Sequence, residues 1–109
     1  MEFLVYSQVI AFHATDSAGR PVYHTNVVMS VGTGVAVLCT ECIEDLEERK
    51  KVVDRLKQTN HEVVDITRDQ VNHFCGNVLE LENWKGYPVL AMSTQAYNAF
   101  TPEQKETLV

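Results

Sequence analysis

The sequence predicts a mixed α/β (α+β) fold in which two β-hairpins are each followed by helix. Runs of β-branched and aromatic residues, separated by short glycine-containing turns, indicate the strands. A highly charged stretch with one apolar stripe at helical spacing indicates a long helix, and two Thr-x-x-Gln capping boxes indicate short helices further on. A chain of 109 residues is expected to form one domain with a modest core.

The first strands are expected before residue 40. Residues 3–12 form an apolar run typical of a strand, and a polar turn with Gly and Pro follows. Residues 22–31 and 35–38 are expected to pair as a hairpin, because the two glycines of the intervening VGTG favour the positive φ angles of a tight turn. In an extended 22–31 strand, alternation places His24 and Asn26 on one face and their neighbours on the other.

The long helix is expected to run from a cap at Thr40 to about Gln58. Acidic residues in its first turns favour the positive end of the helix dipole, and Asn60 marks its end. Its basic residues are interleaved with acidic ones, which is typical of a solvated face with i,i+4 pairs. The apolar stripe consists of Ile43, Leu46, Val53 and Leu56.

The second half of the chain is expected to hold a buried strand, a second hairpin and three short helices. The sequence HEVVDIT at 61–67 is typical of a short buried strand, and the box at 67–70 predicts a helical turn after it. NVLELE and YPVLAM, within 77–92, flank the turn NWKG as a hairpin. Ser93 is expected to cap the next helix, and the box at 101–104, with Pro at its second position, starts the last one.

The composition argues against several classes of function. A net charge of −6 argues against a nucleic-acid backbone as the main partner, because phosphate binding requires a basic face. No run of 18 apolar residues is present, and the N-terminal sequence lacks the basic region and cleavage site of a signal peptide, so no membrane partner is expected. Three cysteines cannot all pair within the chain, which favours a reducing, cytoplasmic location.

The three cysteines are candidates for chemistry, although structural roles are favoured. Cys39 and Cys42 have the C-x-x-C spacing of a zinc knuckle or a redox dithiol, but a zinc site needs four ligands and no second such pair is present. Cys39 also closes an apolar strand, where it fits as a small hydrophobic residue. Cys75 is expected in the core, with Gly76 and Asn77 supplying a tight turn. Structural, redox and zinc-binding roles of the C-x-x-C pair stay open at this point.

The four histidines are the other candidates. His61 and His73 are expected to face solvent at polar ends of elements, and His13 ends the first predicted strand. His24 stands at the mouth of the second predicted strand, with Asn26 two residues on. From the residues alone, a hydrogen-bonded core histidine is favoured over a functional one at this position.

Several segments, taken together, resemble one known superfamily. The stretch VIAFHATDSAGRPVYHTNVVMSVGTGVAVLC, a charged helix, and then HFCGNVLEL and LAMSTQAY are similar to the C-terminal half of the guanidino-group-modifying enzymes. The nearest relatives implied are amidinotransferase-like proteins and citrulline-forming hydrolases, with dimethylarginine dimethylaminohydrolase and arginine deiminase more distant. The resemblance covers about residues 5 to 109, and YHTNV with GNVLEL at this separation is its most specific feature.

The resemblance implies a fold and a mechanism. The superfamily fold is an α/β-propeller (pentein) of five ββαβ blades around a polar channel, and residues 1–109 would be a single fragment of about one and a half blades. A cysteine nucleophile attacks the guanidinium carbon, and a histidine is the general acid/base. His24 falls at the position of that catalytic histidine. Asn26 falls where arginine deiminases carry a substrate-contacting aspartate, so an amide there would accept a hydrogen bond from the guanidinium without adding charge.

The resemblance also predicts what these residues lack. None of Cys39, Cys42 and Cys75 matches the nucleophile, which follows a glycine-rich turn near the C-terminus of the superfamily. The 109 residues are therefore expected to be inactive alone on guanidino substrates, to use no metal or other cofactor, and to contact the remainder of the propeller or to self-associate through open sheet edges. The alternative is a non-catalytic binding or interaction module whose open edges are its partner surface.

Overall fold

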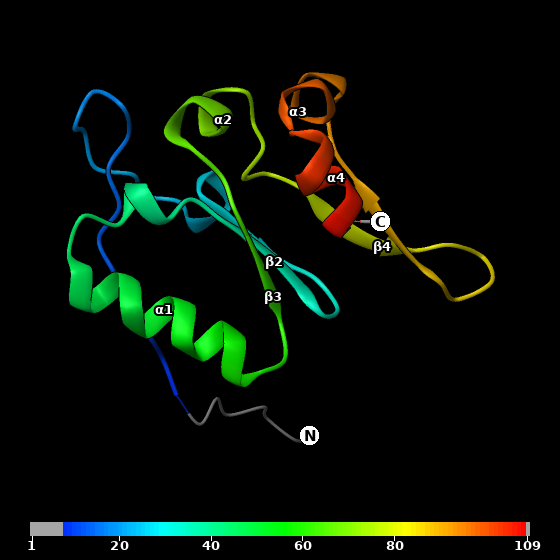
Figure 1. Ribbon diagram of the computed structural model, residues 1–109, viewed down its shortest axis with the longest axis horizontal. Coiled ribbons are helices and arrows are strands. Elements are labelled where there is room, and N and C mark those ends of the chain that lie inside the picture. The colour runs from blue at the N-terminus through cyan, green and yellow to red at the C-terminus, as the bar shows by residue number, and fades with distance from the viewer. Residues whose placement is uncertain (1–7, 109) are drawn as a thin grey trace, which may run out of the picture.

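The computed structural model describes residues 8–108 of the chain as helices, two small sheets and connecting loops (Figure 1). No helix in this part is long and apolar enough to cross a bilayer. The helices are the single-turn 3-10 helices η1 (Thr25–Val27) and η2 (Thr40–Cys42) and the α-helices α1 (Leu46–Gln58), α2 (Arg68–Asn72), α3 (Thr94–Ala99) and α4 (Pro102–Leu108). The strands are β1 (Met29–Val31), β2 (Val35–Leu38), β3 (Glu62–Asp65), β4 (Leu79–Glu82) and β5 (Pro88–Ala91).

The larger sheet has three strands in the order β1-β2-β3. β1 pairs with β2 in antiparallel orientation, whereas β2 and β3 are parallel, from Val35 opposite Glu62 to Leu38 opposite Asp65. A parallel pair needs a crossover connection, and α1 provides it (Figure 1). The mixed α+β class predicted from the sequence is therefore confirmed, with the element order β1, β2, α1, β3.

The central strand β2 is buried on both faces, which explains its unbroken apolar sequence. Alternate residues of the strand point into two separate apolar clusters, because successive side chains leave a strand on opposite faces. The cluster under α1 contains Ala36, Leu38, Ile43, Val52 and Leu56. The cluster on the other face contains Val28, Val37, Cys39, Cys42, Val64, Ile66, Val71, Cys75, Ala96 and Phe100.

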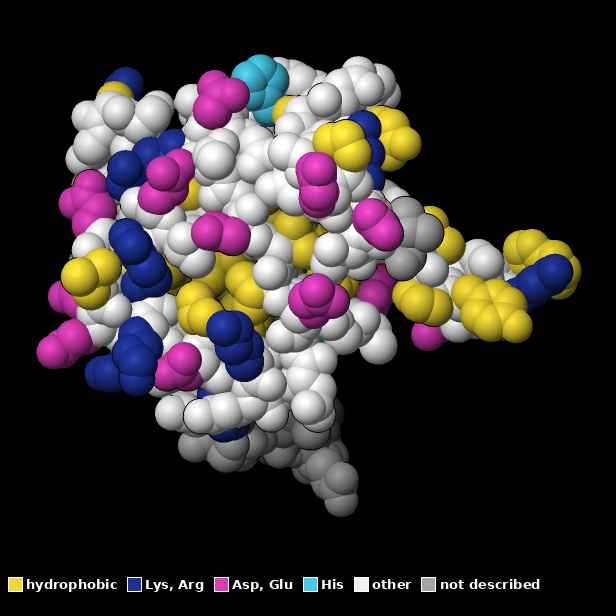
Figure 2. All heavy atoms as spheres, viewed as in Figure 1, with side chains coloured by type: hydrophobic (Ala, Val, Ile, Leu, Met, Phe, Trp, Pro, Cys, Tyr) yellow, Lys and Arg dark blue, Asp and Glu magenta, His cyan; other side chains and the backbone are white. Residues whose placement is uncertain are grey.

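The long helix begins later than predicted. Asp45 caps α1 by accepting two backbone N–H groups of the first turn, at 2.9 and 3.1 Å. Thr40, the predicted cap, begins η2 instead, because its N–H and hydroxyl both donate to Asp65 Oδ1. The predicted end at Gln58 is confirmed, whereas Leu46, predicted in the apolar stripe, is 70% exposed. Figure 2 shows the predicted mixture of acidic and basic side chains on the side of the molecule where α1 lies.

The first predicted strand is not present in the described residues. Residues 8–12 carry no strand pairing, and the rest of the predicted 3–12 strand lies outside the described part of the chain. The predicted turn between β1 and β2 is confirmed, although only one of its glycines has the expected conformation. Gly34 has a φ of +77°, whereas Gly32 does not have a positive φ.

The second predicted strand is much shorter than expected. Of residues 22–31, only Met29–Val31 form β1, and Thr25–Val27 form η1, which is closed by a 3.1 Å bond from the Val27 N–H to the His24 carbonyl. A Thr-Asn sequence favours such local turns because both side chains compete with strand pairing. The alternation that placed His24 and Asn26 on one strand face is therefore wrong.

The second half of the chain follows the prediction closely. Thr67 and Gln70 form a complete capping box at the start of α2, and Ser93 caps α3 by accepting from Ala96 N–H at 3.0 Å. β4 and β5 form the predicted antiparallel hairpin, which projects away from the rest of the molecule in Figure 1. The box between Thr101 and Gln104 is also confirmed.

A hydrogen-bonded pair of glutamine side chains, the buried Gln70 and the half-buried Gln104, joins these helices to the larger sheet. Gln70 is 7% exposed and donates to the Ala99 carbonyl at 3.0 Å and to Gln104 Oε1 at 2.6 Å. Gln104 in turn donates to the Asp65 carbonyl at 2.8 Å. Buried polar groups need such partners, so this network fixes α4 against the end of β3.

Candidate active site

His24 lies in the loop before β1, at the N-terminal end of η1. Its backbone is extended, with φ −116° and ψ 120°, and the residue is exposed. The chain enters this loop through an isolated bridge between Thr15 and Pro21, and it leaves through Val28, which is fully buried. The core histidine favoured from the residues alone is therefore wrong, since His24 is exposed.

A cleft of about 190 Å³ lies beside His24. Both polar and apolar groups form its walls, and two neighbours of His24 line it as well, although strand alternation had placed them on the opposite face. The lining residues are Ile10, Ala11, Phe12, Ala14, Val22, Tyr23, His24, Thr25 and Val28. Asn26 is exposed within η1 and is not among them.

The segment that contains GNVLEL packs directly against the end of the His24 loop and the start of β1. A Cβ added at Gly76 would overlap the Val27 carbonyl oxygen and would lie 3.1 Å from the Val28 carbonyl carbon. Ser30 on β1 donates its hydroxyl to the Gly76 carbonyl at 2.6 Å and accepts from Val78 N–H at 3.2 Å. The two segments that carried the sequence resemblance are therefore in direct contact.

The predicted tight turn at Gly76 and Asn77 is present, closed by a 3.0 Å bond from Asn77 N–H to the Phe74 carbonyl. The turn does not require glycine at position 76, because the positive φ belongs to Phe74, with a φ of +67°. Gly76 is required instead by close approach of two backbones, which only a residue without a side chain allows. Its partner Val27 is far away in the sequence, so no local pattern could have indicated this contact.

None of the three cysteines faces the His24 cleft. All three are completely buried in the core, and none of them lines the cleft. Burial raises the pKa of Cys75, and its sulfur contacts the Ala96 carbonyl at 3.4 Å. The predicted core position of Cys75 is therefore confirmed.

The C-x-x-C pair occupies the core at the end of β2. The sulfur atoms of Cys39 and Cys42 are 2.8 Å apart. Among residues 8–108, no group of three or more His, Cys, Asp or Glu side chains has an arrangement that could hold a metal ion. A structural role fits the complete burial of the pair.

The other histidines lie at the surface, away from the His24 cleft. His13 bonds Glu48 through its backbone N–H and its ring, at 3.0 and 2.9 Å, and these bonds lower the pKa of Glu48. His61 and His73 are half-buried rather than fully exposed. The His61 ring is hydrogen-bonded to the Thr59 hydroxyl, and the His73 ring is hydrogen-bonded to the Asp69 carbonyl. None of these three rings lines the cleft beside His24.

The comparison with protein families gives a match over almost the entire chain. The family described as "N,N dimethylarginine dimethylhydrolase, eukaryotic" matches residues 2–109. The chain belongs to this family. The resemblance to guanidino-group-modifying enzymes is thus confirmed, and the matching family is one of hydrolases rather than amidinotransferases. No curated protein and no solved structure gave a match.

Proposed function

We propose that this chain provides the general acid/base histidine, His24, of a guanidino-group hydrolase that acts on arginine-like substrates. The observation that carries the proposal is an exposed histidine beside a cleft, in a chain of the dimethylarginine dimethylhydrolase family. A planar guanidinium can approach an imidazole in this position, which a ring packed in the core would not allow. The location of the cleft between the His24 loop and residues 10–14 supports the same role.

In the proposed reaction a thiolate attacks the guanidinium carbon and forms a covalent amidino intermediate. His24 donates a proton to the leaving amine and then accepts one from the water that resolves the intermediate. Proton transfer of this kind typically contributes about 10²–10⁴-fold to the rate. Asn26, which follows two residues later in η1, is proposed to accept a hydrogen bond from the substrate.

The nucleophile of this reaction is proposed to come from polypeptide outside these 109 residues. The only three cysteines of the chain are buried and do not line the cleft, so none of them can attack a substrate beside His24. The chain would then act as one part of a larger α/β-propeller. The exposed apolar face of the β4–β5 hairpin supports such a neighbour.

The test has two arms. The 109-residue chain incubated with N,N-dimethylarginine should form no citrulline, because it supplies no nucleophile at the site. In a longer polypeptide that includes this sequence and is active, His24→Ala should lower kcat by about 10²–10⁴-fold, whereas His73→Ala should leave kcat unchanged. Citrulline formation by the 109 residues would overturn the proposal that the nucleophile lies outside them. Full activity of the His24 variant would overturn the proposed catalytic role of His24.

A further inference from the structure

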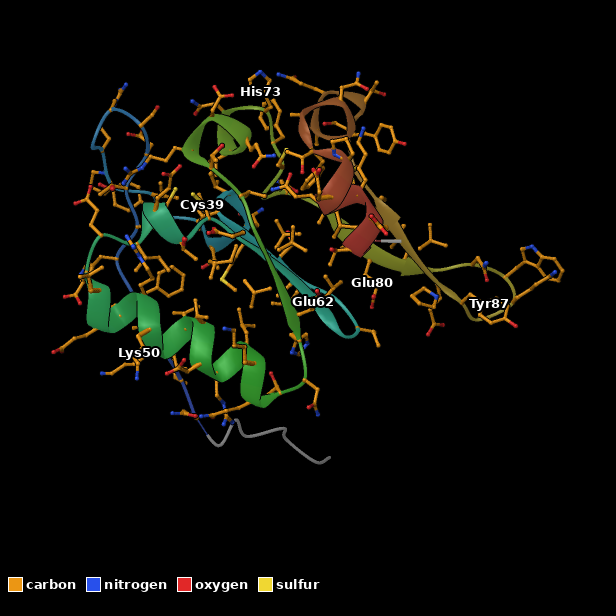
Figure 3. The ribbon with its side chains drawn as sticks, in the orientation of Figure 1. Cys39, Lys50, Glu62, His73, Glu80 and Tyr87 are labelled. Carbon is orange, nitrogen blue, oxygen red and sulfur yellow. The ribbon has the colours of Figure 1, made fainter. Side chains whose placement is uncertain are left out.

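The C-x-x-C pair in the core is arranged closely enough for a bond between its sulfurs. Cys39 Sγ and Cys42 Sγ are separated by 2.8 Å, about 0.8 Å more than the ~2.05 Å of a disulfide. The backbone holds both residues in place: Cys42 N–H bonds the Cys39 carbonyl, Cys39 N–H bonds the Val28 carbonyl at 2.9 Å, and Thr15 N–H bonds the Cys42 carbonyl at 2.9 Å. Figure 3 shows Cys39 in the interior, beyond the end of β2. The two thiols therefore need little backbone movement to join.

The two thiols differ in their electrostatic surroundings. The hydrogen bond between them lowers the pKa of Cys42, and the nearby positive charge of the Arg68 guanidinium lowers it further. The same bond to Cys42, together with burial, raises the pKa of Cys39. Cys42 is therefore the more acidic of the two thiols, and it is the one that more readily becomes a thiolate.

The hydrogen bonds of Arg68 fit this assignment. Its Nη2 donates to Thr15 Oγ1 at 3.0 Å and to Glu44 Oε1 at 3.2 Å, whereas its Nε is buried without a hydrogen-bond partner among the described residues. A buried unpaired N–H group is costly, and a thiolate beside the guanidinium would offer it both a charge and an acceptor.

We propose that Cys39 and Cys42 form a peroxide-sensitive dithiol that closes to an intramolecular disulfide. The Cys42 thiolate attacks one peroxide oxygen, so that the O–O bond breaks, a sulfenic acid forms and hydroxide leaves. The Cys39 sulfur, giving up its proton, then attacks the Cys42 sulfur, which forms the S–S bond and releases the sulfenic oxygen as water. In total, two thiols lose two electrons to one hydroperoxide, which is reduced to two water molecules, or to water and an alcohol.

The burial of the pair determines which oxidant fits. Both residues are 0% exposed, so a small hydroperoxide is favoured over a bulky disulfide such as oxidised glutathione. Cys75 is an internal control, because it is equally buried but has no thiol partner, and burial alone raises its pKa. Susceptibility to oxidation follows thiolate character, so Cys75 should react last.

The experiment is oxidation of the reduced 109-residue chain with hydrogen peroxide, followed by intact mass and peptide mapping. The expected result is the loss of two hydrogen atoms and a linkage between Cys39 and Cys42, which dithiothreitol reverses. The Cys75→Ser variant should behave in the same way. In Cys39→Ser, a dimedone adduct should form on Cys42, because no second thiol is present to resolve the sulfenic acid.

A charge variant tests the role of Arg68. Arg68→Gln should slow disulfide formation severalfold, because loss of the guanidinium charge raises the pKa of Cys42, whereas the exposed Arg55→Gln should leave the rate unchanged. The proposal is overturned if folded wild-type chain forms no Cys39–Cys42 linkage, or if Cys75 is oxidised first. A rate in Arg68→Gln equal to that of the wild type would overturn the assignment of Cys42 as the attacking sulfur. The mass measurement needs no variant to fold and no catalytic activity.

Discussion

Replacing Gly76 with alanine should destabilise the protein through a single backbone contact. The added Cβ would overlap the Val27 carbonyl oxygen and would lie 2.9 Å from the Val27 carbonyl carbon. Because both atoms belong to the backbone, no side-chain rotation relieves the overlap, and one of the two segments must move. Overpacking of a core costs typically 1–3 kcal/mol, and we expect about 3 kcal/mol here because the obstacle is backbone.

The assay is thermal unfolding followed by circular dichroism. A domain of about this size loses roughly 4–8 °C in Tm for each kcal/mol, so Gly76→Ala should lower Tm by about 12–24 °C. Gly86→Ala is the matched control, because Gly86 has a φ of +83° but nothing within 4 Å of its Cβ position. Its cost, from the positive φ alone, should be about 1–2 kcal/mol. A Gly76 variant that melts within 2 °C of the wild type would refute the close approach.

Three further substitutions test other contacts. Asp45→Ala removes the cap of α1 and should cost about 1 kcal/mol, measured by urea unfolding. Gln70→Ala leaves the bonds to Ala99 and Gln104 unmade and should cost about 1–3 kcal/mol in the same assay. Hydrogen bonds from Thr33 lower the pKa of Glu80 from 4.5, so the folded state holds that proton less tightly than the unfolded state. The resulting stabilisation is present at neutral pH and is lost as pH falls below 4.5. Glu80→Gln should therefore lower the urea midpoint at pH 7 and not at pH 3. An equal loss at both pH values would contradict this role of Glu80.

Local chemistry made much of the secondary structure predictable. The capping boxes at Thr67 and Thr101 and the cap at Ser93 depend on residues three positions apart, and all three helices begin where these patterns place them. The cap of α1 failed as a prediction because Thr40 is engaged by Asp65, which lies 25 residues further along the chain. A tertiary contact, which the local sequence pattern does not report, thus accounts for the later start of the helix at Asp45.

The candidate site depended even more on long-range contacts. The sequence identified His24 through its resemblance to a family, but strand alternation gave it the wrong environment, because residues 25–27 form a 3-10 turn instead of extending β1. The position of Gly76 against the His24 loop and that of Arg68 beside Cys42 were also missed, because both depend on contacts between distant segments. Each touches a segment at least 26 residues away, Val27 in one case and Cys42 in the other, and no periodicity in the sequence reports such contacts.

The β4–β5 hairpin leaves one apolar face uncovered. Leu79 and Leu81 lie on the same face as Val89, the cross-strand partner of Leu81, and these side chains are 60%, 49% and 44% exposed. Figure 2 shows the hairpin projecting from the body with hydrophobic side chains along it, and Figure 3 places Tyr87 near its tip. A two-stranded hairpin of this kind is marginally stable unless its apolar face is packed against something. Concentrated solutions of the 109 residues should therefore contain self-associated chains.

Sedimentation velocity tests this expectation. The wild-type chain should sediment faster as its concentration rises from micromolar to millimolar, because two hairpin faces can cover each other. The double variant with Leu81→Lys and Val89→Lys should stay monomeric over the same range, since docking of a second hairpin would bury the lysine charges and bring the lysines of the two chains together. Leu46→Lys is the matched control: Leu46 is 70% exposed on α1, outside the hairpin, so its replacement should leave self-association unchanged. A wild-type chain that stays monomeric at every concentration would refute the expectation that this apolar face drives self-association.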